Sequence, residues 1–123
     1  MTHVLVCGPD RTLVELVAWN LAQTRFTVQS QVWNPCGDVA PGVASTEDIV
    51  VADFGDHDPP CWAGAAHLRL IAPSVPLLLL SYGWPSAARL RPLEPCVHVR
   101  KLPIIQEILA AADRLATDRR RSA

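Results

Sequence analysis

The sequence predicts an α/β protein built on a doubly wound, five-stranded parallel sheet. Two observations carry this prediction: apolar runs of strand length recur along the chain, and amphipathic segments of helical length alternate with them. Each parallel pair of strands needs a right-handed crossover, which such segments can supply. With 123 residues, no linker and no internal repeat, the chain is expected to fold around one core.

The five predicted strands differ in their expected burial. Unbroken apolar runs are typical of strands covered on both faces, and the most hydrophobic run, 76–81, is expected at the sheet centre. The alternating run 26–32 indicates an edge strand with one exposed face. In chain order, the strands are predicted at His3–Cys7, Phe26–Val32, Asp48–Asp53, Pro76–Ser81 and Val97–Arg100.

Four helices are predicted around these strands. Asp10 has the chemistry of an N-cap for the first helix, Pro73 ends the second, and Pro85 stands near the first turn of the third. The turn-rich stretch 34–45 gives little helical signal. In chain order, the helices are predicted at about 11–24, 62–71, 86–93 and 104–118.

Composition and charge narrow the functional classes. Eleven Lys and Arg residues against twelve Asp and Glu residues give a net charge of −1, so no global field favours nucleic acid or an anionic membrane. No apolar run approaches the roughly 18 residues of a membrane span, so a soluble, cytoplasmic protein is expected. A domain over 1–118 is followed by a basic tail, 119–123. The four cysteines match no zinc motif and indicate reduced thiols.

Three polar residues stand at the carboxyl ends of predicted strands. They are Asp53, Ser81 and Lys101. In an open parallel sheet these ends meet in one crevice, so an acid, a hydroxyl and an ammonium there form a candidate site. No glycine-rich phosphate loop follows the first strand, which weighs against a nucleotide-binding enzyme.

In order and spacing, these three residues resemble the anchors of a response-regulator receiver domain, and the resemblance covers essentially the whole chain. Asp53 matches the phosphoacceptor, Ser81 the hydroxyl and Lys101 the lysine, with separations of 28 residues (53 to 81) and 20 residues (81 to 101). The resemblance implies a flavodoxin-like receiver fold with strand order 2-1-3-4-5. It places His98 at the position of the switch aromatic. It also implies phosphoryl transfer to Asp53, with magnesium and Lys101 neutralising the phosphoryl oxygens.

The chain departs from the receiver pattern after its first strand. The family holds magnesium with the phosphoacceptor and an acidic pair, and that pair is replaced here by Gly8 and Pro9, which carry no carboxylate. Asp10, one residue further on, is either a substitute ligand or a helix cap. Asp53 and Asp10 are therefore the candidate metal ligands. Magnesium is the cofactor that the resemblance implies, but the missing acids lead us to expect none.

Two further departures lie near the mouth of the crevice. Tyr82 follows the hydroxyl residue where the family usually has a small side chain, so access to the acid is expected to be narrowed. The family's proline after the lysine is displaced by one position, in Lys101-Leu102-Pro103. Either Lys101 keeps its place and the following turn differs, or the register slips, Lys101 points elsewhere and Arg100 is a substitute cation.

Two functions are consistent with these features. The favoured one is an atypical receiver that is not an enzyme and acts as a signal-transduction interaction module, with phosphorylation of Asp53 reduced or absent. The alternative is a phosphorylation-competent single-domain response regulator that accepts a phosphoryl group on Asp53 from a histidine kinase or a phosphotransfer protein. In both cases the expected partner is a protein: a histidine kinase, a phosphotransfer protein, an output protein or a second copy of the chain. Neither nucleic acid nor a membrane is expected.

Overall fold

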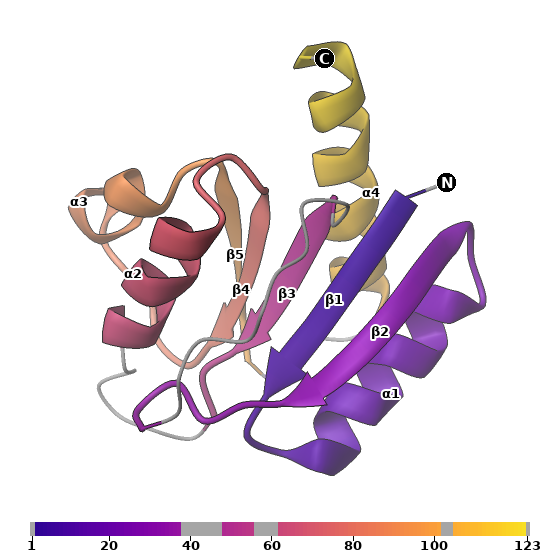
Figure 1. Cartoon of the computed structure of the whole chain (residues 1–123), viewed down its shortest axis with the longest axis horizontal. Coiled ribbons are helices and arrows are strands. Elements are labelled where there is room, and N and C mark those ends of the chain that lie inside the picture. Colours follow the sequence, from indigo (N-terminus) through magenta and orange to yellow (C-terminus); the bar gives the residue numbers. More distant parts are fainter. Residues whose placement is uncertain (1, 38–47, 56–61, 102–104, 123) are drawn as a thin grey trace.

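The computed structural model describes residues 2–37, 48–55, 62–101 and 105–122. Five parallel strands form one sheet in the order β2-β1-β3-β4-β5, with helices on both faces (Figure 1). This confirms the predicted fold class and strand order. The strands are β1 (Thr2–Gly8), β2 (Phe26–Val32), β3 (Ile49–Asp53), β4 (Leu77–Ser81) and β5 (Cys96–Arg100). The helices are α1 (Arg11–Ala22), α2 (Trp62–Ile71), α3 (Ala87–Leu90), the 3₁₀ turn η1 (Arg91–Leu93) and α4 (Ile105–Ser122).

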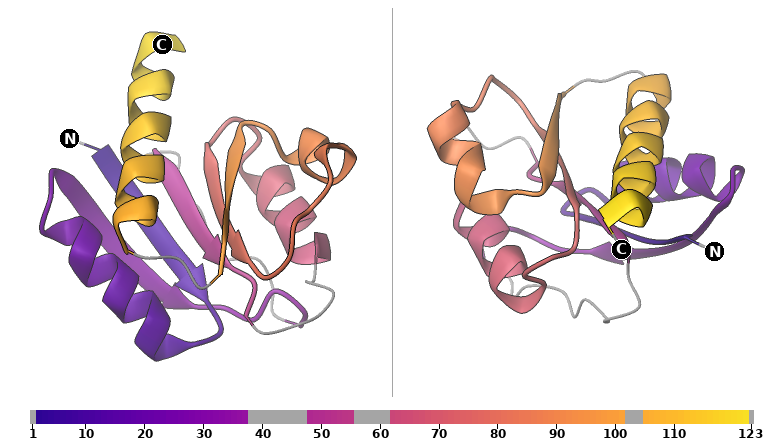
Figure 2. Two further views of the ribbon diagram at one scale, coloured as in Figure 1. Left: turned by 180° about the vertical axis from the view of Figure 1, so that it is seen from behind. Right: turned by 90° about the horizontal axis from the view of Figure 1, so that it is seen from above.

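The sheet separates two apolar cores. Successive side chains of a strand point to opposite faces, so the unbroken apolar runs of β1, β3 and β4 supply both cores at once. Helices α1 and α4 cover one face, whereas α2 and η1 cover the other (Figures 1 and 2). From these three strands, the α1/α4 core takes Val4, Val6, Ile49, Val51, Leu78 and Leu80, and the α2/η1 core takes Leu5, Cys7, Val50, Ala52, Leu77 and Leu79.

The segment that follows β2 packs on the α2 side of the sheet. Trp33 is buried, its backbone N–H donates to the Gly8 carbonyl over 2.7 Å, and its ring lies edge-on to Phe54 at 6.1 Å. A Cβ atom built on Gly64 of α2 would come within 2.7 Å of the Pro35 Cβ, so this helix position needs glycine for close approach. Most of the predicted turn-rich stretch lies outside the described residues.

Helix α3 is shorter than predicted. It spans Ala87–Leu90 and continues as the 3₁₀ turn Arg91–Leu93, whereas the sequence predicts one helix over 86–93. Pro92 explains the change, because a proline ring inside an α-helix clashes with the preceding turn and lacks the N–H for its hydrogen bond. The start of the helix is set by Ser86, whose side chain accepts from the backbone N–H of Arg89.

Helix α4 continues to Ser122, beyond its predicted end near Asp118. Arg119, which the sequence places in the basic tail, donates to the carbonyl of Ser74 over 3.1 Å and lies 3.6 Å from a carboxylate oxygen of Asp48. These contacts anchor the last turn of the helix to the loop before β4 and to the residue directly before β3. No helix in the described part of the chain is both long and apolar enough to cross a bilayer.

Arg69 of α2 fastens this helix to the turns around it. Its guanidinium donates to the carbonyls of Ala72 at 2.7 Å, Val75 at 2.8 Å, Leu93 at 2.6 Å and Pro95 at 3.1 Å. Partial burial among these carbonyls lowers the pKa of Arg69, although the group stays charged. The α2 helix, the loop after it and the η1 to β5 turn are therefore held as one unit.

The cysteines depart from expectation at one position. Cys7 and Cys96 are free thiols, but Cys36 is disulfide-bonded, so the prediction of four reduced thiols is wrong there. Folding brings distant cysteines together, and sequence spacing alone does not reveal such a pairing. Burial, with a smaller contribution from the nearby Asp53 carboxylate, raises the pKa of Cys7 to about 12. Cys7 is thus an inert core thiol near neutral pH.

Candidate functional site

The structure brings Asp53 and Lys101 together at the carboxyl edge of the sheet. The buried end of β3 positions Asp53, and Lys101 follows directly after β5. The Lys101 Nζ lies 2.8 Å from Asp53 Oδ1, and both side chains are only 3% exposed. Lys101 therefore keeps its place beside the acid, and Leu102 and Pro103 lie outside the described residues.

Gly55 connects the two members of this ion pair. Its N–H donates to Asp53 Oδ1 over 3.1 Å, and its carbonyl accepts from Lys101 Nζ over 3.2 Å. Gly55 has a φ of 71°, a left-handed conformation that side chains with a Cβ rarely adopt. The other carboxylate oxygen, Asp53 Oδ2, is buried and has no hydrogen-bond partner among the residues that the structure describes. One oxygen of the Asp53 carboxylate is thus paired with an ammonium, and the other is buried away from solvent.

Ser81 and His98 form a second polar pair on neighbouring strands. Ser81 ends β4 and is fully buried, and its Oγ lies 2.7 Å from His98 Nε2 on β5. Burial lowers the pKa of His98, and its bond to Ser81 partly opposes this effect. The residues at the two predicted switch positions, Ser81 and His98, are therefore bonded to each other.

Gly8 fills the position where receivers carry an acid, and the structure leaves no room there for a side chain. A Cβ atom built on Gly8 would lie 2.7 Å from the Asp53 Cβ and 3.2 Å from a methyl group of Val14. Asp10 caps α1, since its Oδ1 accepts from the backbone N–H groups of Thr12 and Leu13 over 3.0 and 3.3 Å. The side chain of Asp10 is exposed in this role.

The residues around Asp53 do not fit a magnesium ion. Magnesium needs a near-octahedral set of oxygen ligands, and Gly8 and Pro9 supply no carboxylate. The Lys101 ammonium occupies Asp53 Oδ1, so only Oδ2 of this carboxylate is left to contribute to a metal ligand set. Over the described ranges, no three His, Cys, Asp or Glu side chains gather as a metal site would require. The loop acids Asp56 and Asp58 lie outside those ranges.

Two aromatic residues after β4 lie over the cations at the end of β5. The Lys101 Nζ is 5.1 Å from the centre of the Tyr82 ring, and the Arg100 guanidinium is 5.1 Å from the Trp84 ring. Gly83 between them has a φ of 77°, which permits the sharp turn. Tyr82 thus covers the ammonium that neutralises Asp53.

Sequence reasoning found the acid, hydroxyl and lysine but missed the features that couple them. The Gly55 bridge, the contact of Gly8 with Asp53 and the bond from Ser81 to His98 depend on distances that spacing does not give. Gly8 and Gly55, which lie at or near strand ends, were the sequence signal for these contacts, because glycine there often marks a close approach of the backbone to another group.

Comparison with solved structures defines the class of fold: the chain has the receiver fold of response regulators. No family model and no curated protein matches the chain.

Individual solved structures show how far the likeness extends. A CheY-like receiver domain protein from Methanospirillum hungatei JF-1 matches with a TM-score of 0.78 and 10% identity, over 100% of this chain and 99% of that one. The non-phosphorylated HemR receiver domain from Leptospira biflexa gives 0.73 and 20%, over 95% of each chain. A protein assigned to pilus assembly, cpaE from Burkholderia thailandensis E264, gives 0.71 and 18%, over 95% of this chain and 99% of that one. At these identities the likeness is one of fold.

Proposed function

We propose that this chain is an atypical receiver that serves as a protein-interaction module in signal transduction, with phosphorylation of Asp53 reduced or absent. It acts by binding and catalyses no reaction of its own. Its partner is a histidine kinase, a phosphotransfer protein or an output protein, and a homodimer is the alternative assembly. In this role the protein is located in the cytoplasm and binds neither nucleic acid nor a membrane.

The observation that carries the proposal is the closed position of the missing metal-binding acids, where a Cβ atom on Gly8 would lie 2.7 Å from the Asp53 Cβ. Phosphoryl transfer to a carboxylate depends on a metal and cations that stabilise charge developing on the phosphoryl oxygens. Here Lys101 supplies a cation 2.8 Å from the acid, but Gly8 packs against the Asp53 Cβ where metal ligands would stand. With Asp53 only 2% exposed, a phosphodonor would have to displace this arrangement before reacting.

The alternative, a phosphorylation-competent response regulator, is favoured by a different observation. Asp53, Ser81 and Lys101 lie at the same edge of the sheet, on the strands where receivers carry them. The residues at the hydroxyl and switch-aromatic positions, Ser81 and His98, are bonded to each other. If the loop acids supplied a metal site, these residues would suffice for slow transfer.

Reaction with a small phosphodonor separates the two functions. The full chain is incubated with acetyl phosphate and Mg²⁺, quenched in acid and analysed by intact mass, with the Asp53→Asn variant and a phosphorylatable receiver run in parallel. We expect no mass increase of one phosphoryl group on this chain under conditions that label the reference receiver. A readily formed adduct that the Asn variant lacks would establish the alternative.

A further inference from the structure

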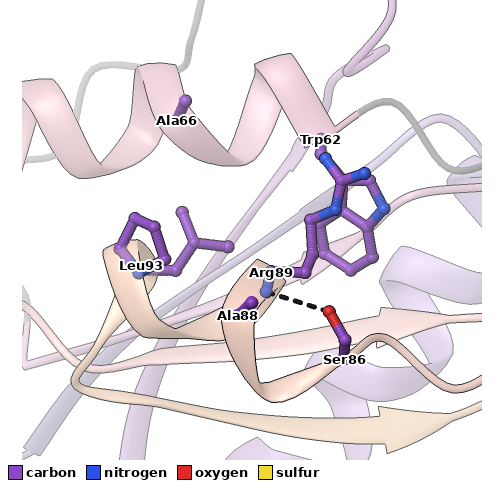
Figure 3. A pocket seen from close by; sticks show the side chains of 7 residues that line it. Trp62, Ala66, Ser86, Ala88, Arg89 and Leu93 are labelled. Atoms are coloured by element: carbon purple, nitrogen blue, oxygen red, sulfur yellow. Dashed lines mark hydrogen bonds between the residues drawn. The ribbon is translucent and has the colours of Figure 1, made fainter.

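A surface groove lies between α2 and the segment formed by α3 and η1, away from Asp53. Its volume is about 430 Å³, which is within the size range of sites that hold a single large side chain or small molecule. Figure 3 shows Ala66 and Trp62 on α2 and Ala88, Arg89 and Leu93 on the opposite segment, with Trp62 and Arg89 close together at one end. The small alanine side chains leave the space between the two segments open.

The walls of the groove combine apolar surface with one cationic group. The Trp62 indole is half-buried and Leu93 is buried, so both present fixed apolar surface. The Arg89 guanidinium lies 5.7 Å from the centre of the Trp62 ring. The backbone N–H of Arg89 bonds to Ser86, but its guanidinium forms no ion pair with any carboxylate in the described part of the chain.

The charge of the segment that carries one wall of the groove differs from that of the chain as a whole. Residues 82–101 carry four basic side chains and one acidic side chain, Glu94, whereas the whole chain has 11 basic and 12 acidic residues. Lys101 is buried against Asp53, so the exposed charge of this segment is that of Arg89, Arg91 and Arg100 against Glu94. Of these side chains Arg89 lines the groove, and its positive charge favours an acidic partner.

The two sides of the groove are held in place independently of any ligand. Arg69 of α2 donates twice to the Leu93 carbonyl, at 2.6 and 3.2 Å, which fixes η1 against the helix. Phe54 packs against Trp62 with ring centres 5.4 Å apart, which fixes the aromatic wall. A site formed in advance loses less conformational entropy on binding.

We propose that this groove binds an acidic segment of a protein partner through an aromatic side chain flanked by carboxylates. The aromatic ring lies between Trp62 and Leu93, and a carboxylate accepts from the Arg89 guanidinium. Tryptophan and arginine are the residues that most often dominate protein interfaces. The inference rests on the proposed interaction role and assigns a surface to it. It does not depend on whether Asp53 is phosphorylated.

Binding of a defined peptide tests the proposal. A blocked pentapeptide with a central phenylalanine and two glutamates on each side is titrated into the full chain, and binding is followed by amide chemical shifts. We expect shifts at Ala66, Arg89 and Leu93, and an affinity at least about tenfold above that of the same peptide with lysines for glutamates. Raising the salt concentration should weaken binding.

Matched variants separate the groove from general charge effects. Arg89→Gln is expected to weaken peptide binding about tenfold, whereas Arg114→Gln, which removes an exposed charge from α4, should leave it within about twofold. Ala66→Glu places an acid at an exposed groove position with good helix propensity, and should weaken binding similarly while keeping the thermal midpoint. Equal binding of the acidic and basic peptides would overturn the proposal. So would shifts outside the groove, or shifts at these residues that grow with protein concentration alone and so indicate a second copy.

Discussion

Replacing Lys101 with methionine should strongly destabilise the fold, because it leaves the Asp53 carboxylate buried without a counter-charge. Both side chains are 3% exposed and 2.8 Å apart, so solvent screens the pair very little. Removing one member of such a pair costs about 3 to 5 kcal/mol of unfolding free energy. That is a large fraction of the roughly 5 to 15 kcal/mol by which domains are stable.

Urea unfolding at neutral pH measures this effect. With an m value of about 2 kcal/mol/M, the midpoint of Lys101→Met should fall by about 2 M. The double variant that also carries Asp53→Asn should recover at least about half of the loss, since the unpaired charge is then gone. The exposed pair of Arg11 and Glu15, 3.8 Å apart, provides the control, and Glu15→Gln should change stability by less than about 1 kcal/mol.

The reasoning would be refuted by a small effect of the single variant. A loss of unfolding free energy below about 1 kcal/mol for Lys101→Met would show that the pair contributes no more to stability than an ordinary surface ion pair. A double variant no more stable than Lys101→Met would show that the lysine acts through packing of its stem and not through charge.

Three further predictions follow from the site and its surroundings. Gly8→Asp, which restores the acid that receivers carry, should destabilise the fold by about 1 to 3 kcal/mol in urea unfolding, because its Cβ would meet Asp53 at 2.7 Å. Arg69→Met should cost about 2 kcal/mol in the same assay, since four backbone carbonyls lose their donor. Stability should fall as the pH is lowered from 7.5 to 5.5, because burial lowers the His98 pKa and the unfolded chain therefore binds the proton first. In His98→Gln this part of the pH dependence should disappear.

Each of these predictions has a control or an opposing outcome. Gly37→Ala introduces a Cβ with no atom within 4 Å, so it should cost far less than Gly8→Ala. A methionine variant at Arg69 as stable as the parent would show that water replaces the lost donors. A steeper loss of stability toward pH 5.5 in His98→Gln than in the parent would reverse the sign argued for the histidine.

The fold could be predicted from the sequence because its signals are local. Buried parallel strands appear in the sequence as unbroken apolar runs. The ends of these runs also predicted the carboxyl edge of the sheet, where Asp53 and Lys101 lie. The predicted bounds of two helices were wrong. Pro92 shortens α3, and α4 continues past Asp118, where Arg119 contacts a distant part of the chain.

The state of the candidate site could not be predicted, because it depends on distances between strands. The same three side chains would be expected for an open, metal-binding crevice or for a closed ion pair. Only the 2.8 Å separation of Lys101 from Asp53, and the absence of space at Gly8, separate these states. The hydrogen bonds of the Arg69 guanidinium could not be predicted either, because they go to backbone carbonyls, which every residue type carries.

The buried pair has a consequence for how such chains are recognised. Selection for folding alone would retain a buried carboxylate and ammonium that stabilise one another. Loss of either one would leave the other as an unpaired charge in an apolar environment. Retention of both residues across relatives would therefore carry no information about phosphoryl transfer. Exchange of both together for an apolar pair, in a relative that keeps the same partner, would reveal that the transfer chemistry had been lost while the binding role continued.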